Sequence, residues 1–376
     1  MANFVVHEHF PKTLLGFFMS LYTPRADTDQ CQTLKPKEVL IEAHKHNSNM
    51  PENIKLLCGD LRLHCAEESI RAACNYREIP INALPPWVKQ RLRLLEFLKV
   101  AALESEKETV VFIDTNPTLD IFTEIALMTA NKLVVPVMSD DYSTAALRKI
   151  VYLLYGVGCS KALAIKQFEE TTFWSKVRQY NCKVARVHTV MFNKCNVRAH
   201  TLIQAQGSIW EQQCEVLLSI LNDVCKSGVD ANDVFNFDAR RQPKSASTMG
   251  NMFGCHMTDM QTAGIICMRC GLPLWMLRRN RQAICEKMKM THGAVSNLSK
   301  GAEDSYNTTL LQLIGDVKRI DNTYCIDDTD TTMKPVLYAL LRGQKTMPKK
   351  AVKRTFEQAE MDSTAAWGGG KLHEEQ

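Results

Sequence analysis

The stretch TVVFIDTNPTLDIFTEIALMTANKLVVPVMSDDYSTAALRKIVYLLY, residues 109–155, decides the fold. It opens with an apolar run at residues 110–113, which ends in Asp114. A short uninterrupted apolar run is typical of a strand that is buried on both faces, and open α/β sheets bind ligands at the carboxyl ends of their strands. The sequence therefore predicts a buried strand with the Asp114 carboxylate at its end.

The same stretch continues with the pattern of a βαβα unit. A turn at Asn116 and Pro117 is followed by a helical run at residues 119–130 and by a second apolar run at residues 133–137. Ser143, a residue type that caps helices, precedes apolar side chains at helical spacing. This alternation predicts an α/β fold with a doubly wound, mostly parallel sheet that carries helices on both faces.

Composition places the chain among ordinary globular proteins. It has 376 residues, of which 45% are hydrophobic and 23% are charged. No apolar run approaches the ~18 residues of a membrane span, and the N-terminus lacks the pattern of a secretory signal. The 14 cysteines are expected to be reduced, as in an intracellular protein. A net charge of +5 mildly favours an anionic partner.

Three strings of this stretch resemble a known family. FIDTNPTLDIFTEIAL, LVVPV and DDYSTAAL, in this order, are similar to the middle of the ParA family of partition ATPases, which belong to the MinD/ParA group with a P-loop NTPase-like fold. In that family a Walker B aspartate ends a strand, a loop with a proline follows, and the next helix carries T-x-x-A-L. These positions are Asp114, Pro117 and residues 123–127 here. The resemblance covers about residues 27–320.

The phosphate loop of that family is poorly matched. Its pattern, K-G-G-x-G-K-[ST], falls on residues 7–13, where only Lys12 and Thr13 agree. The positions of the three glycines and the first lysine are held by other residues: Glu8, His9, Pro11 and His7. Glycines let backbone N–H groups turn toward phosphates, and proline has no N–H group. We therefore expect residues 1–34 to be degenerate or rearranged, which weakens the expectation of ATP binding and hydrolysis.

The resemblance implies ATP and Mg²⁺ as cofactors and assigns residues to them. Asp27 and Asp29 lie in DTDQC, residues 27–31, which resembles a D-x-D-x-Q loop of the family whose first aspartate helps position water or magnesium, although a solvated turn has the same composition. Asn193 follows an apolar run and matches an asparagine that contacts adenine, although asparagine is also a common turn former. The implied catalytic residues are Asp27, Asp29 and Asp114. The implied nucleotide contacts are Lys12, Thr13, Asn116, Pro117 and Asn193. The residues implied to bind Mg²⁺ are Thr13 and Asp114.

Two further motifs lie late in the chain. Partition ATPases bind DNA non-specifically through basic residues in this region, and phosphate contacts need only lysine and arginine on one face. The candidates here are Arg278, Arg279, Arg281, Lys287 and Lys289. A solvated helix face would carry the same charges. Cys267 and Cys270 form a C-x-x-C, which related iron–sulfur carriers use, but a single pair is more typical of packing residues.

These observations predict one organisation and leave two functions open. Residues 1–343 would form a ParA-like nucleotide-binding domain, and residues 344–376 a basic tail expected to be disordered. The resemblance implies an ATP-dependent switch for plasmid or chromosome partitioning: a cytoplasmic, nucleoid-associated homodimer that binds DNA non-specifically and responds to a ParB-like stimulatory protein. The alternative is a non-catalytic pseudo-ATPase of the same fold that binds DNA or a partner.

Overall fold

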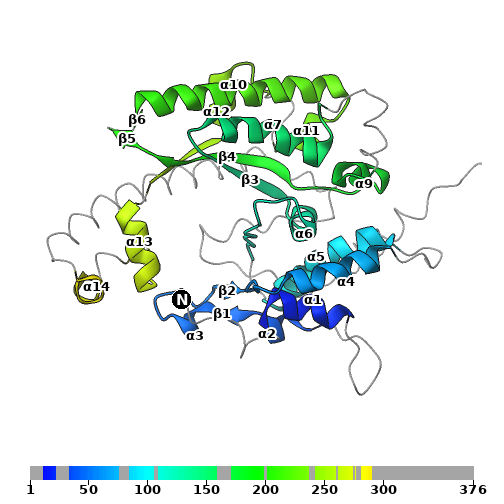
Figure 1. Ribbon diagram of the computed structural model, residues 1–376, viewed down its shortest axis with the longest axis vertical. Helices are drawn as coiled ribbons and strands as arrows, with labels where there is room; N and C mark the ends of the chain where they lie inside the picture. The colour runs from blue at the N-terminus through cyan, green and yellow to red at the C-terminus, as the bar shows by residue number, and fades with distance from the viewer. Residues whose placement is uncertain are drawn as a thin grey trace, which may run out of the picture. The chain divides into compact units, whose positions relative to one another are not determined.

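The fold is that of a computed structural model of the chain (Figure 1). It describes residues 12–22, 34–75, 84–105, 109–158, 171–198, 201–236, 242–259, 261–273, 276 and 281–289. These residues form two compact units. The helical unit contains residues 12–40 and 57–130, and the sheet unit contains residues 41–56 and 131–289. That residues 1–343 make one domain stays a prediction.

The sheet unit is built on three parallel strands. They are β3 (Lys132–Val137), β4 (Arg186–Cys195) and β7 (Gly254–Thr258), in the order β3-β4-β7. Lys132 lies opposite Arg186 in the first ladder, and Phe192 lies opposite His256 in the second. The parallel sheet and the strand predicted at residues 133–137 are therefore confirmed, because β3 begins and ends within one residue of that run.

Helices α7 (Asp141–Tyr155), α10 (Gln204–Ser227), α11 (Ala231–Val234) and α12 (Ala246–Phe253) gather on one side of β3 and β4 (Figure 1). The long helix α10 buries a stripe at helical spacing, made of Leu217, Ile220, Leu221 and Val224. This stripe explains why α10 packs against the neighbouring helices α7, α11 and α12. A helical layer on the other face of the sheet stays a prediction.

Helix α7 begins differently from the prediction. Its cap is Asp140, whose carboxylate accepts a hydrogen bond from the Ser143 backbone N–H at 2.6 Å. Ser143 lies inside the first turn and its hydroxyl accepts from the Met138 N–H at 3.1 Å. Both residue types cap helices, and the carboxylate is the one that also complements the positive end of the helix.

Shorter elements complete the sheet unit. The antiparallel pairs are β1 (Ile41–Glu42) with β2 (Lys55–Leu56), and β5 (Val197–Arg198) with β6 (Thr201–Leu202). The remaining helices are α3 (Ala43–His46), α9 (Phe173–Gln179), α13 (Gln261–Cys270) and α14 (Arg281–Met288).

The helical unit has its own core. It contains α1 (Leu14–Tyr22), α2 (Pro36–Val39), α4 (His64–Cys74), α5 (Pro86–Glu104) and α6 (Ile121–Thr129). Phe17 of α1 and Phe97 of α5 are buried, with ring centroids 4.7 Å apart. Ile121 and Ile125 of α6 belong to the same core, which confirms the helix predicted at residues 119–130. Among the described residues, no helix combines the length and apolar character that crossing a membrane requires.

The strand predicted at residues 110–113 is wrong. These residues belong to no strand or helix and pair with no strand in the part of the chain that the structure describes. Phe112 is 84% exposed and Val111 is 46% exposed, whereas Ile113 packs against the core of the helical unit. One side chain of the run therefore has apolar neighbours within its unit, and the expected burial on both faces does not occur.

Candidate functional site

The residues predicted to hold phosphate lie at the start of α1. Thr13 is 3% exposed and its hydroxyl accepts a hydrogen bond from the Gly16 N–H at 3.1 Å. This is the geometry of a helix cap. The Leu14 N–H donates to the Cys58 carbonyl at 2.8 Å, and Thr13 forms a parallel bridge with Cys58. Lys12 precedes the cap and is exposed. This pair lies at the end of the helix that carries a partial positive charge, where the Leu14 and Gly16 N–H groups already donate to Cys58 and Thr13.

A carboxylate contacts Thr13, and it is Asp60. The Asp60 side chain has no exposed surface and accepts a hydrogen bond from the Thr13 side chain. Arg62 donates to the same carboxylate from its backbone N–H at 2.9 Å, from Nε at 3.2 Å and from Nη2 at 3.3 Å. Sequence reasoning missed Asp60, because the contact with Thr13 joins residues far apart in the chain.

The charge on Asp60 is stabilised by these partners. Burial alone would raise the pKa of Asp60, but the hydrogen bonds and charge of Arg62, together with the Thr13 hydroxyl, outweigh it. The pKa of Asp60 therefore lies below its ordinary value of 3.8. Asp60 is an ionised group that is shielded from water, and its balancing charge comes from the protein itself.

Asp114 lies in a different environment. It is exposed and follows the apolar run at residues 110–113. Its carboxylate makes no hydrogen bond or ion pair with any residue in the described part of the chain. The structure thus does not bring Asp114 to the end of a paired strand, which was the basis on which the sequence predicted its position.

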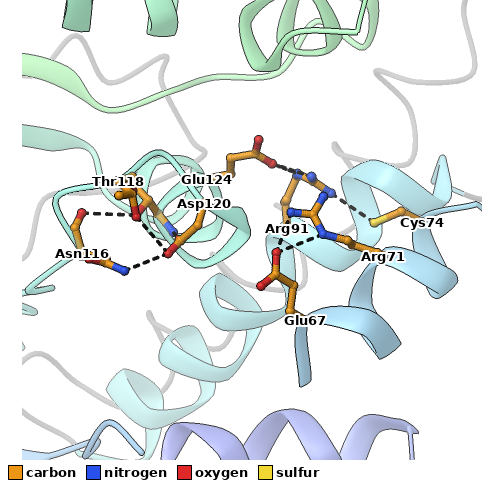
Figure 2. Close-up of polar contacts among 9 residues, drawn as sticks. Glu67, Arg71, Cys74, Arg91, Asn116, Thr118, Asp120 and Glu124 are labelled. Atoms are coloured by element: carbon orange, nitrogen blue, oxygen red, sulfur yellow. Dashed lines mark hydrogen bonds and ion pairs between the residues drawn. The ribbon is translucent and has the colours of Figure 1, made fainter. Parts of the chain in front are cut away.

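The loop after Asp114 is tied to the start of α6 (Figure 2). Asp120 caps this helix by accepting from the Thr123 N–H at 2.8 Å. Asn116 Nδ2 also donates to Asp120, at 3.1 Å, and Thr118 Oγ1 donates to it at 3.4 Å. Asn116, predicted to contact nucleotide, therefore organises this loop together with the neighbouring Pro117, and both are exposed.

Asn193 lies near the end of β4, close to its predicted position. The strand continues for two more residues, to Cys195, beyond the end that the sequence predicted. The Asn193 side chain accepts a hydrogen bond from the Lys194 N–H at 2.9 Å, and Lys194 has a left-handed backbone with φ of 55°. Asn193 thus lies at an irregularity of the β4–β7 ladder between Phe192 and Cys195, and a contact with adenine stays a prediction.

Basic side chains gather between α13 and α14. Arg269, Lys287 and Lys289, with Met288, line a hollow of about 350 Å³. These three cations form no ion pair with an acidic residue of the described chain. Lys287 and Lys289 were predicted from the sequence as DNA contacts, whereas Arg269 was missed because it lies apart from them in the sequence.

Several predicted residues cannot be placed. Asp27, Asp29, Arg278 and Arg279 lie outside the described residues, as do residues 7–11 of the phosphate loop and the tail at 344–376. Arg281 begins α14, but its side chain is not described. Cys267 and Cys270 pack against a small core that contains Ile266 and Ile284, which agrees with a packing role.

Mg²⁺ does not fit Thr13 and its neighbours as they are arranged. The Thr13 hydroxyl donates to Asp60 and accepts from Gly16. The carboxylate of Asp60 is filled by Arg62 and Thr13. A magnesium ion requires oxygen ligands at near-octahedral positions, together with several waters, and these oxygens already have protein partners.

The family comparison matches the middle of the chain. Residues 30–161 match the family model of an AAA domain. This model describes P-loop NTPase domains of the ParA/MinD-like group, which is what residues 30–161 are similar to. The AAA domain match spans about a third of the chain and includes Asp60 and Asp114 but begins after Lys12 and Thr13. The searches of curated proteins and of solved structures returned no match.

Proposed function

We propose that this protein is a ParA-like, nucleotide-dependent switch that binds DNA non-specifically and acts in plasmid or chromosome partitioning. The observation that carries the proposal is the position of Lys12 and Thr13 at the start of α1, next to a segment that matches an AAA domain. Helix starts attract phosphate through their dipole as well as their N–H groups, and in α1 the dipole carries the argument because the Leu14 and Gly16 N–H groups already donate to Cys58 and Thr13. Lys12 adds a full positive charge beside them.

In this proposal Lys12 and the first turn of α1 hold the phosphates of ATP. Phosphoryl transfer depends on positioning and charge neutralisation, so the lysine is the residue whose loss matters most. Mg²⁺ has no part in this proposal, because Thr13 and Asp60 are satisfied by protein partners. Asp114 and Asn116, the latter tied to the cap of α6, are exposed and accessible to a ligand.

The DNA contacts are assigned to the basic surface of α13 and α14. Lys287 and Lys289 lack acidic partners among the described residues, and they line the same hollow as Arg269. Phosphate neutralisation by such residues is independent of base sequence and weakens steeply with salt. Dimerisation on ATP, a ParB-like stimulatory partner and a cytoplasmic, nucleoid-associated location complete the proposal by resemblance to the ParA family.

Equilibrium binding of a fluorescent ATP analogue tests the nucleotide half of the proposal. The wild type should bind saturably, and Lys12→Ala should weaken binding about ten- to hundredfold, because it removes one charged phosphate contact. Lys89→Ala, which removes an exposed lysine from α5, is the matched control and should leave the affinity unchanged. If the wild type does not bind the ATP analogue saturably, the proposal of a nucleotide-dependent switch is wrong.

A non-catalytic pseudo-ATPase is the second candidate, and a specific observation favours it. Thr13 is buried and occupied by Asp60, and Asp114 is exposed rather than held at a strand end. Such a protein would bind DNA equally well with and without ATP. DNA binding measured at two salt concentrations, with ATP present and absent, separates the candidates: a switch requires that ATP changes the affinity.

A further inference from the structure

The residue that closes the start of α1 is Arg62. Asp60 carries a carboxylate with no exposed surface, and an ionised group in that position requires a positive partner. Arg62 supplies that charge through Nε and Nη2, and its own side chain is 42% exposed. The guanidinium thus lies between a buried carboxylate and solvent.

The same carboxylate accepts a hydrogen bond from the Thr13 hydroxyl. A carboxylate and a hydroxyl oxygen side by side are the hard oxygen ligands that Mg²⁺ and Mn²⁺ prefer, and Mg²⁺ commonly binds through one or two carboxylates while it keeps several waters. The ligand types for a divalent cation are therefore present. What excludes the cation is the guanidinium, which already provides the positive charge and fills the carboxylate.

We propose that Arg62 takes the place of a divalent cation at the Thr13–Asp60 pair, and that its removal creates a site for Mg²⁺ or Mn²⁺. The inference rests on the proposed function in one respect: Thr13 is the residue that would bind the metal ion of a bound nucleotide. In the wild type, the Asp60 carboxylate beside the start of α1 is then neutralised by Arg62, and nucleotide binding through Lys12 does not depend on Mg²⁺.

A purely local role for Arg62 is the competing account. The Arg62 N–H donates to Asp60 two residues earlier, which is the pattern of an Asx turn. A turn of this kind uses the backbone of residue 62 and would form with any side chain there. The two accounts predict different metal binding once the guanidinium alone is removed.

The test measures binding of Mn²⁺ to the full chain without nucleotide, from the paramagnetic resonance signal of the free ion. Arg62→Gln should bind one Mn²⁺ saturably, at least about tenfold more tightly than the wild type, because it removes from the carboxylate a positive charge that repels the metal ion. Arg71→Gln is the matched control, since Arg71 pairs with Glu67 on the exposed side of α4. It should bind no more Mn²⁺ than the wild type.

The double variant Arg62→Gln/Asp60→Asn should lose the gained binding, because the carboxylate is its main ligand. If Arg62→Gln is unfolded without metal, millimolar Mn²⁺ should restore its helical circular dichroism. Equal Mn²⁺ binding by wild type and Arg62→Gln, no binding or refolding of Arg62→Gln, or retained binding in the double variant would each overturn the inference. Since no nucleotide is present, these results are independent of whether Lys12 binds ATP.

Discussion

Arg91 and Glu124 form a buried ion pair that joins α5 to α6 (Figure 2). The Arg91 Nε lies 2.9 Å from a Glu124 carboxylate oxygen, and the two side chains are 6% and 18% exposed. The guanidinium also lies 4.1 Å from the centroid of the Trp87 ring and donates to the Cys74 sulfur at 3.1 Å. Each nitrogen of the Arg91 guanidinium therefore has a protein acceptor, and the Trp87 ring lies against the guanidinium.

Breaking this pair should destabilise the helical unit strongly. Glu124→Gln keeps the shape of the side chain but leaves Arg91 buried without its countercharge, at a cost of roughly 3 kcal/mol in the free energy of unfolding. Glu67→Gln, which breaks the more exposed pair with Arg71 on α4, should cost less than about 1 kcal/mol. Urea denaturation of both variants measures the difference, and equal costs would show that the Arg91 pair is not decisive.

The folded sheet unit should lose stability as the pH falls below about 6.5. Burial lowers the pKa of His256 below its ordinary value of 6.5, and its Nε2 has no hydrogen-bond partner among the described residues. The unfolded chain then binds a proton at about pH 6.5 that the folded chain does not bind, so the free energy of unfolding decreases toward acid. Urea denaturation at several pH values measures the slope, which should be shallower in His256→Gln. An unchanged slope in that variant would assign the effect to other groups.

The exposure of Phe112 makes a sharp stability prediction. Because Phe112 is 84% exposed, Phe112→Ala should cost less than about 0.5 kcal/mol, as surface substitutions usually do. Ile125→Ala, at a core position that is 1% exposed, should cost roughly 2–5 kcal/mol. Chemical denaturation of the two variants compares them directly. A cost above about 3 kcal/mol for Phe112→Ala would instead support the buried strand predicted from the sequence.

Two glycines of the sheet unit should respond to alanine in opposite directions. A methyl group on Gly254 would collide with the Trp210 ring and with the Gly250 carbonyl oxygen, so Gly254→Ala should cost about 1–3 kcal/mol. A methyl group on Gly207, in the first part of α10, would lie 4.0 Å from its nearest neighbour, on Leu202. Gly207→Ala should therefore stabilise the protein by about 0.5–1 kcal/mol. Thermal unfolding distinguishes the two, and destabilisation by Gly207→Ala would contradict the open space there.

Periodicity predicted the elements with long patterns. The helical spacing after Ser143, which became α7, and the apolar run that became β3 were read correctly, because each pattern extends over several residues. The run at residues 110–113 failed because four apolar residues fit a strand or an extended connection equally well. Whether such a run becomes a strand depends on which surfaces its side chains can pack against, and of these four residues only Ile113 packs against the core of its unit.

The candidate site was less predictable than the fold. Lys12 and Thr13 were singled out because they match the last two positions of the phosphate-loop pattern of the ParA family, and Thr13 caps α1. Asp60 was missed because no local pattern links it to Thr13; the contact exists only once Cys58 pairs beside the start of α1. Arg269 was missed because it lies apart in sequence from the basic residues of α14 and joins them only in the folded chain.

The ladder between β3 and β4 limits how the matched segment can be studied. β3 lies within residues 30–161, but the strand that it pairs with begins at Arg186. A fragment that ended at residue 161 would leave the backbone of β3 without this neighbour and would uncover Val135 and Val137, which are 5% and 3% exposed. Such an open, apolar edge invites self-association, so the fragment should precipitate where the whole chain stays in solution.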